Sequence, residues 1–376
     1  MCESAGAQLL KPSVPRKIPQ LDGVRGIAIL IVLAHNLHGF SSLPFSLLTT
    51  YGWMGVDLFF VLSGFLITGI LLDAKSSPDY FRNFYARRCL RIWPLYYCVL
   101  ALMFVVIPHV KPQVAGEIFH RSNPWWAYLF YLQNFLVREP ASAVAALGVS
   151  WSLAVEELFY LVWPWLVRYL PVKRLEYCAW LVFLGSPFFR LFAVFHGWII
   201  YSNPFCRLDG LMAGGLLAIL VRKREFSADR YLYAAWAGLI SAVPLAITSE
   251  MLHERWLTFS LATIGSAGLV YLAQYSGRRW LTVILTNRFL MFTGTISYGL
   301  YLLHKLPDDI FKSRGIAAAH PQLAFWSAVL CSYVIATASW YLFEKPILRL
   351  KKYFDNKPDP SGRGAMSFPK PSVAEA

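Results

Sequence analysis

Charged residues are scarce in this sequence. Asp, Glu, Lys and Arg make up 15% of its 376 residues, whereas typical soluble domains contain about 25%. Apolar residues supply 57% and aromatic residues 16%, and the mean hydropathy is +0.48. So little polar surface argues against a water-soluble pair of domains, although the length alone would permit one. The chain is therefore predicted to form a single integral-membrane domain.

Several common sequence signals are also missing. The six cysteines include no Cys-Xaa-Xaa-Cys pair and no metal-ligand spacing, so no metal site is predicted. No short apolar region with a small-residue cleavage site follows the polar residues 1–17, so the first apolar run is predicted to remain as an anchor. No internal repeat is evident, which weakens the case for an inverted-repeat transporter. Glycines within apolar runs favour close helix packing over nucleotide binding: Gly64, Gly69, Gly214 and Gly215.

Acidic residues are fewer than basic ones, 21 against 35, and the formal net charge is +14. A basic chain can indicate nucleic-acid binding. Here, however, the Lys and Arg residues cluster in short segments between apolar runs, as the positive-inside rule predicts for cytoplasmic loops. No nucleic-acid partner is therefore expected, and membrane lipids are the expected surroundings.

Ten apolar runs have lengths that suit membrane spans. The predicted fold is an all-α polytopic bundle with about ten transmembrane helices, at 18–40, 51–72, 92–110, 151–170, 177–199, 206–221, 231–248, 256–275, 289–304 and 323–343. The transmembrane domain is predicted to cover 18–352. A cytoplasmic tail at 1–17 and a disordered cytoplasmic tail at 353–376 are predicted to flank it.

The apolar segment 125–137 has only 13 residues, too few for a helix to cross about 30 Å of hydrocarbon. If it crossed, later basic loops such as those around Lys173, Arg222 and Arg278 would all lie outside, against the positive-inside rule. A re-entrant or interfacial segment is therefore predicted here. Both termini then lie in the cytoplasm.

The first span carries Arg25 near one end and His35 ten residues later. Ionisable groups are costly in hydrocarbon and usually have a function there. At 1.5 Å per residue, the two side chains lie roughly 15 Å apart along the helix. A neutral imidazole can accept a proton from a hydroxyl, so His35 is the candidate base. A hydrogen-bonded packing role for this histidine is the alternative.

Further polar residues lie in or beside the other spans. Asp57 and Ser63 belong to the second span, where Ser63 could instead bond its own helix backbone. Arg88 and Arg91 share one helix face at the cytoplasmic surface, where two guanidinium groups suit a diphosphate or simply hold the topology.

Two adjacent carboxylates, Glu156 and Glu157, follow Trp151 and Ser152 in an otherwise apolar run. They point about 100° apart on a helix, so at least one is predicted to face the protein interior. There it could orient an imidazole, pair with an arginine or form a purely structural ion pair.

Taken together, these motifs closely resemble the acyltransferase-3 group of multi-pass membrane O-acyltransferases. The resemblance covers nearly the whole chain, and each motif is weak alone but strong as part of an ordered series. The motifs are Leu21-Asp22-Gly23-Val24-Arg25-Gly26 with His35, Gly55 to Phe65, Arg88-Cys89-Leu90-Arg91-Ile92-Trp93-Pro94, Trp151-Ser152 with Glu156 to Tyr160, Arg207-Leu208-Asp209-Gly210, Ser297 to His304, and Glu344-Lys345-Pro346.

The resemblance implies transfer of an acyl group, often acetyl from acetyl-CoA, to a hydroxyl of a glycan, a lipid-linked sugar or a secondary metabolite. It implies that His35 is the catalytic residue, with Glu156 or Glu157 orienting its ring. The implied substrate-binding residues are Arg25, Asp57, Ser63, Arg88, Arg91, Trp151, Arg207 and Asp209. General-base and acyl-histidine mechanisms both remain open.

Beyond the acyl-CoA donor, the resemblance implies no tightly bound cofactor. The chain ends soon after Glu344-Lys345-Pro346 and is expected to be the stand-alone form, without an extracytoplasmic esterase-like domain. The expected location is a bacterial inner membrane. The alternative function is a transporter or flippase in which buried His, Arg and Glu residues form a substrate or proton path.

Overall fold

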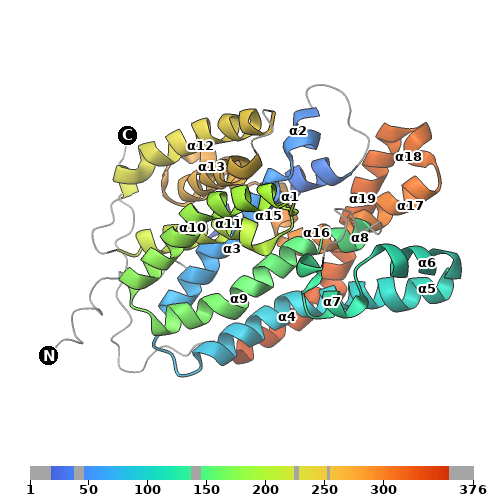
Figure 1. Ribbon diagram of the computed structural model, residues 1–376, viewed down its shortest axis with the longest axis horizontal. Coiled ribbons are helices and arrows are strands. Elements are labelled where there is room, and N and C mark those ends of the chain that lie inside the picture. Colours follow the sequence, from blue (N-terminus) through green and yellow to red (C-terminus); the bar gives the residue numbers. More distant parts are fainter. Residues whose placement is uncertain (1–17, 38–45, 137–144, 224–227, 252–254, 355–376) are drawn as a thin grey trace.

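The structure, a computed structural model, describes residues 18–37, 46–136, 145–223, 228–251 and 255–354. Its regular elements in these ranges are all helices (Figure 1), which confirms the predicted all-α class. The predicted tails at 1–17 and 353–376 lie outside the described residues, apart from 353 and 354. The end of the predicted first span, 38–40, also lies outside them.

Within the described ranges, seven helices are long and apolar enough to cross a membrane, and each overlaps a predicted span. Two of them continue through short π- or 3₁₀-helical stretches. They are α3 (Met54–Asp73), α4 (Tyr80–Ala101) with η1 (Leu102–Val106) and α5 (Ile107–Val110), α9 (Trp151–Tyr169), α10 (Val172–Phe195), α12 (Ala228–Met251), α13 (Arg255–Tyr275), and α19 (Pro321–Ser339) with η3 (Trp340–Glu344), α20 (Lys345–Leu348) and η4 (Arg349–Phe354).

The other three predicted spans form helices that do not meet these criteria. The helix α1 (Pro19–Asn36) has a lower mean hydropathy because polar residues occupy both of its ends, and α11 (Pro204–Leu220) has only 17 residues. The predicted span 289–304 divides at Ile296 into α15 (Arg288–Thr295) and α16 (Ser297–Leu303). The structure therefore supports seven spanning helices, and the count of about ten stays a prediction.

The remaining helices are short. They are α2 (Ser46–Tyr51), α6 (Pro112–Arg121), α7 (Trp125–Leu129), η2 (Gln133–Phe135), α8 (Ala145–Gly148), α14 (Arg279–Leu285), α17 (Lys305–Ser313) and α18 (Ile316–Ala319). In the segment predicted not to cross, α7 has five residues, which rise about 7.5 Å. A turn and the 3₁₀ helix η2 follow it, so no single helix in 125–136 could traverse the hydrocarbon.

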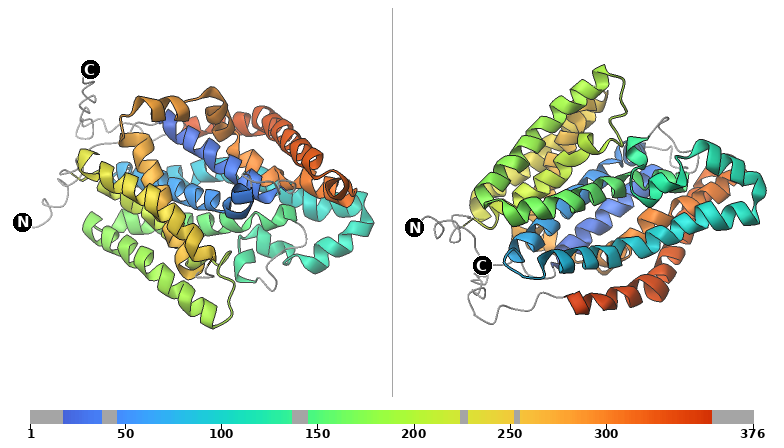
Figure 2. Two further views of the ribbon diagram at one scale, coloured as in Figure 1. Left: turned by 90° about the horizontal axis from the view of Figure 1, so that it is seen from above. Right: turned by 60° about the horizontal axis from the view of Figure 1, so that its bottom comes forward.

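The centre of the bundle is formed by α1 and α3, which pack against each other and against α11, α13 and α15 (Figure 2). Several outer helices expose apolar side chains. Leu181 and Phe188 of α10 are 74% and 69% exposed, and Leu330 of α19 is 65% exposed. Apolar residues on the outside of a bundle suit a hydrocarbon environment, so these helices are suited to face lipid.

Glycines allow the central helices to approach closely. A Cβ atom at Gly64 of α3 would lie 2.0 Å from the carbonyl oxygen of Leu211 in α11, and one at Gly214 would lie 2.1 Å from that of Val61. Gly23 and Gly26 of α1 make similar backbone approaches to Leu285 and Leu290. The predicted packing role of glycines in apolar runs is confirmed at these contacts.

Candidate active site

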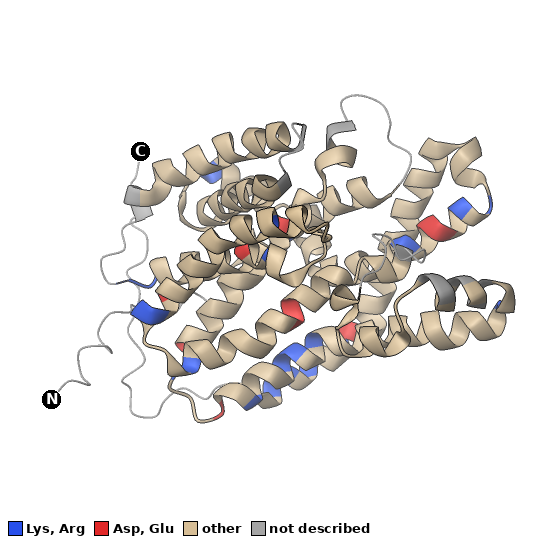
Figure 3. Ribbon diagram, viewed as in Figure 1, with Lys and Arg blue, Asp and Glu red and all other residues tan. Residues whose placement is uncertain are grey.

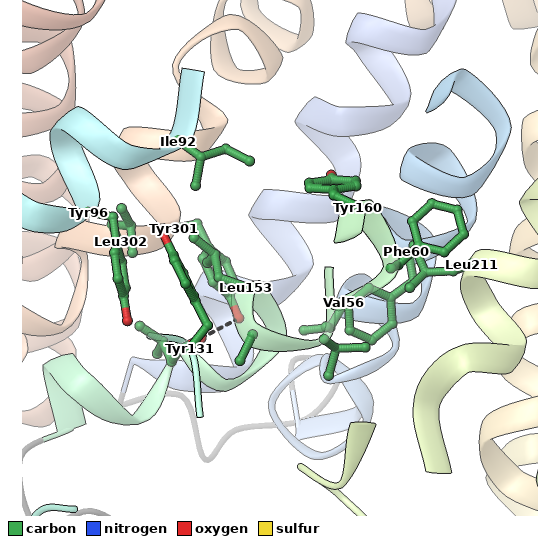
Figure 4. Packing of buried hydrophobic residues seen from close by; sticks show 14 of the residues in the cluster. Val56, Phe60, Ile92, Tyr96, Tyr131, Leu153, Tyr160, Leu211, Tyr301 and Leu302 are labelled. Atoms are coloured by element: carbon green, nitrogen blue, oxygen red, sulfur yellow. Dashed lines mark hydrogen bonds between the residues drawn. The ribbon is translucent and has the colours of Figure 1, made fainter. Parts of the chain in front are cut away.

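A cavity lies inside the bundle between α1, α3, α4, α9 and α16. Its volume is about 110 Å³, below the roughly 300–1,000 Å³ of pockets that enclose drug-sized ligands. It therefore suits one small group of a ligand rather than a whole nucleotide-containing molecule. Five predicted site residues line it: Arg25, Ser63, Arg88, Arg91 and Glu156. Apolar and aromatic side chains from α3, α4, α9 and α16 also line it, including Val56, Phe60, Ile92, Leu153, Tyr160 and Tyr301. Figure 4 shows these six residues within the packed core.

Glu156 accepts a hydrogen bond on each carboxylate oxygen. The hydroxyl of Ser63 in α3 donates to Oε1 at 2.8 Å, and the hydroxyl of Tyr160 donates to Oε2 at 2.9 Å. Tyr160 follows Glu156 by four residues, one turn of α9, so both side chains share the helix face that lines the cavity. With both oxygens held, the carboxylate occupies a fixed position near Arg88 and Arg91.

Of the two adjacent carboxylates, Glu156 is the one that lines the cavity. Glu157 is not part of the lining and lies beside Trp93 of α4. The two residues are one position apart, which turns their side chains about 100° away from each other around α9. Both were predicted as catalytic, and of the two only Glu156 lines the cavity with the predicted arginines.

Basic residues gather along the first half of α4 (Figure 3). The helix α4 begins at Tyr80, twelve residues before the predicted span 92–110, so these basic residues are part of the helix. Arg88 and Arg91 lie three residues apart on the cavity face, as predicted. In the part of the chain that the structure describes, neither forms an ion pair with a carboxylate, and Nε of Arg88 is buried without a partner. Arg25 of α1 does have one, since its Nη1 lies 3.0 Å from Asp22.

His35 lies near the C-terminal end of α1 and is not part of the cavity lining. Its Nδ1 is 2.6 Å from the carbonyl oxygen of Thr49 in α2. A carbonyl can only accept a hydrogen bond, so Nδ1 carries the proton and Nε2 is the basic nitrogen. His35 also adjoins Gly52, four residues before Val56, which lines the cavity. His35 therefore lies beside the residues that precede α3 and is not part of the cavity lining.

Three other predicted residues, Asp57, Arg207 and Asp209, lie outside the cavity in a buried ionic network. Arg207 of α11 donates from Nη2 to Oδ1 of Asp57 at 2.9 Å, and both side chains are at most 1% exposed. Asp209 accepts from Arg190 of α10 at 2.9 Å and from Ser260 of α13 at 2.7 Å. The network links four helices, so its evident role is to hold them together.

Trp151, the last predicted site residue, belongs to an aromatic group around Arg207. The guanidinium carbon of Arg207 lies 5.5 Å from the Trp151 ring centroid and 3.8 Å from that of Phe259. Trp151 also packs edge-on against Phe60, which lines the cavity. These contacts place Trp151 between the ionic network and the cavity wall. The face of its ring attracts the positive charge of Arg207 in a cation–π interaction.

Several polar residues at these sites were not predicted as site residues, although all of them except Arg190 lie within the quoted motifs. Ser152 and the hydroxyl of Tyr301 line the cavity 2.7 Å apart, and Tyr298 donates to the carbonyl of Ile92 at 2.6 Å. The spacing of Tyr160 from Glu156 offered one signal, since residues four apart share a helix face. Arg190 could have been found as a lone arginine within a predicted span. Within the described ranges, no group of three or more His, Cys, Asp and Glu residues is arranged to hold a metal ion.

The sequence profile of the acyltransferase-3 family, described as an acyltransferase domain, matches residues 18–345. The chain belongs to this family. The resemblance predicted from the ordered motifs is thereby confirmed, and every residue that lines the cavity falls within the matched range.

Two relatives of this acyltransferase-3 chain illustrate the similarity. The peptidoglycan O-acetyltransferase OatA of Listeria monocytogenes serovar 1/2a (strain ATCC BAA-679 / EGD-e) is 28% identical over 88% of this chain and 56% of its own length. YrhL of Bacillus subtilis (strain 168), named as a candidate peptidoglycan O-acetyltransferase, is 29% identical over 88% of this chain and 55% of its own. The chain thus spans about half the length of these relatives. No solved structure matches it significantly.

Proposed function

We propose that this acyltransferase-3 chain moves an acyl group, typically acetyl, from acyl-CoA to a hydroxyl of a glycan or lipid-linked sugar. The observation that carries the proposal is the cavity in which Arg25, Arg88 and Arg91 meet Glu156 and Ser63. Arginine side chains match phosphate oxygens in shape and charge. The names of the two relatives, peptidoglycan O-acetyltransferases, support a glycan as the acceptor.

In the proposed arrangement, the donor phosphates bind at the arginines and the pantetheine arm runs beside α1 toward His35. Arg25 and His35 are ten residues apart, roughly 15 Å along the helix, so an elongated donor could contact both. The phosphate end is then the cytoplasmic end, with both termini in the cytoplasm. This orientation agrees with the positive-inside rule for the basic residues of α4.

His35 is the proposed catalytic residue. Its Nε2 accepts the proton of the acceptor hydroxyl while the oxygen attacks the thioester carbonyl carbon. The C–S bond then breaks, a C–O bond has formed, and the proton passes from Nε2 to the departing CoA thiolate. The hydrogen bond from Nδ1 to the carbonyl of Thr49 fixes the tautomer that these proton transfers require. Attack by Nε2 itself, giving an acyl-histidine, is the competing route through the same nitrogen.

The test is acyl transfer by the purified full-length chain in lipid vesicles. The protein is given acetyl-CoA labelled in the acetyl group, together with peptidoglycan fragments or lipid-linked sugars. Label in the acceptor, released by mild alkali as expected for an ester, supports the proposal. A transporter or flippase would consume no donor, so unchanged acetyl-CoA with movement of a substrate across the vesicle would overturn it. Mass spectrometry of host glycans with and without the chain would identify the acceptor by one added acyl group.

A further inference from the structure

The C-terminal end of the described chain returns to the basic part of α4. Both α20 and η4 pack against α4, and the guanidinium carbon of Arg82 lies 5.7 Å from the ring centroid of Phe354 in η4. These contacts bring Lys351 of η4 toward the end of the cavity that the arginines line. Lys351 follows Glu344-Lys345-Pro346, the last motif of the family resemblance, by five residues, and the family profile ends at residue 345.

The charged groups near Lys351 include four arginines, Arg91, Arg88, Arg87 and Arg25, from α4 and α1. In the described part of the chain, Lys351 itself forms no ion pair and no hydrogen bond. Basic side chains from three separate elements therefore converge, although repulsion between their charged forms opposes it.

Among the nearby carboxylates, Asp22 is bonded to Arg25 of the cluster. Glu156 and Glu344 lie near Arg91 but accept their hydrogen bonds from other residues, Glu156 from Ser63 and Tyr160, and Glu344 from Ser339 at 3.1 Å. Basic groups outnumber carboxylates in this cluster. A bound polyanion would stabilise it, because phosphate oxygens can accept hydrogen bonds from several basic side chains at once. The positive-inside rule requires only that basic residues lie on the cytoplasmic side, where they could be dispersed in solvent. The rule therefore does not explain why these residues converge.

We propose that Lys351 binds a phosphate of the acyl donor, so that η4 forms one wall of the donor site beyond the cavity. This inference rests on the proposed function. Lys351 does not line the cavity, whereas Arg25, Arg88 and Arg91 do. Lys351 therefore contacts the part of the donor that remains outside, which in acyl-CoA is the phosphorylated nucleotide.

The test compares two donors in vesicles of neutral phosphatidylcholine. For acetyl-CoA, Lys351→Ala is expected to raise KM about tenfold or more, the effect of losing one hydrogen bond to a charged group. For acetyl-pantetheine, which has the thioester and no phosphate, the same substitution is expected to leave KM unchanged. Lys351→Arg keeps the charge and is expected to restore most of the affinity for acetyl-CoA. Lys352→Ala is the matched control, since Lys352 is exposed and lies 5.0 Å from the ring centroid of Tyr353.

Three results would overturn the inference while leaving the proposed function intact. The first is an unchanged KM for acetyl-CoA in Lys351→Ala, and the second is an equal rise for both donors. The third is an effect that appears only when phosphatidylglycerol is added, which would assign Lys351 to a lipid phosphate. If the wild-type protein transfers no acyl group, the proposed function fails. Titration calorimetry with CoA then tests separately whether Lys351 binds a phosphate. Equal CoA affinity of wild type and Lys351→Ala would then reject it.

Discussion

The hydroxyl of Ser63 donates to Oε1 of Glu156 at 2.8 Å, which joins α3 to α9 across 93 positions of sequence. Serine in an apolar helix commonly bonds its own backbone one turn back. Here it reaches another helix instead and fixes a carboxylate inside the cavity. Ser63, which belongs to the motif Gly55 to Phe65, is thus a partner of Glu156, and no pattern in the sequence pairs these two residues.

Glu156 and Glu157 should differ in their contribution to activity. We expect Glu156→Gln to lower kcat at least tenfold, because the neutral amide removes the negative charge held beside Arg88 and Arg91. Glu157→Gln should have a smaller effect, since this side chain does not line the cavity. Steady-state rates with acetyl-CoA check this, with expression and elution volume compared between the variants. Equal losses in both variants would contradict the assignment.

Replacing His35 should abolish transfer. A positioned general base contributes roughly 10²- to 10⁴-fold, so His35→Ala is expected to reduce the rate by at least that range while the helix inserts normally. His196→Ala is a suitable control, because His196 is exposed and bonds only the carbonyl of Phe192 in its own helix. Rates in reconstituted vesicles provide the measurement. Substantial turnover by His35→Ala would remove this residue from the mechanism.

The cavity arginines should affect the donor more than the acceptor. Arg88→Ala or Arg91→Ala is expected to raise KM for acetyl-CoA about tenfold or more, the effect of one lost hydrogen bond to a charged group. KM for the acceptor should change little. The control is Arg174→Ala in α10, since Arg174 is exposed and does not line the cavity. A similar rise in both KM values would indicate a structural role.

The buried pair of Arg207 and Asp57 should matter mainly for stability. Arg207→Ala leaves a buried carboxylate without its partner, and such losses typically cost about 3–5 kcal/mol. The expected result is a clear fall in the midpoint of thermal unfolding in detergent. The double variant Arg207→Met with Asp57→Leu should recover part of the loss, because it removes both charges together. A single variant as stable as the wild type would show that the pair contributes little.

The orientation of the bundle can be tested by thiol labelling in a cysteine-free background. Ala141→Cys is expected to react with an impermeant reagent on intact cells, because segment 125–137 is predicted not to cross. The charge pattern places the segment around position 175 on the opposite, cytoplasmic face. Leu175 itself is fully buried and would be a poor reporter, so the exposed Lys173 is used in its place. Lys173→Cys should react only after lysis. The reverse pattern would invert the predicted cytoplasmic loops.

Hydropathy was sufficient to locate the seven long spanning helices, but not the residues that divide or shorten the others. Ile296 separates α15 from α16 within a run predicted as one span. Gly294 and Ser297 flank the break, and glycine and serine are common where a helix kinks or breaks. The three-residue spacing of Arg88 and Arg91 also predicted that they share one helix face, because this depends only on local helix geometry.

Which polar residues share a site depends on contacts between helices, and sequence periodicity carries little information about these. Asp57 and Ser63 are six residues apart in α3, yet Ser63 lines the cavity and Asp57 belongs to the ionic network. Tyrosines such as Tyr301 resemble ordinary core residues until their hydroxyl partners are known. Lys351 follows the last recognisable motif, and its position beside α4 depends on how the chain turns after α19.

The close approach of Gly23 and Gly26 to Leu285 and Leu290 also sets an order of assembly. The helix α1, which carries Arg25 and His35, is synthesised about 260 residues before the backbone of α14 and α15 that these glycines contact. At roughly 5–20 residues per second, that interval lasts on the order of 13–50 s. During this time, α1 can pack against α3 but not against α14 and α15. A ribosome that stalls before residue 285 therefore leaves a chain with both cavity arginines of α4 and the histidine of α1 but no completed site.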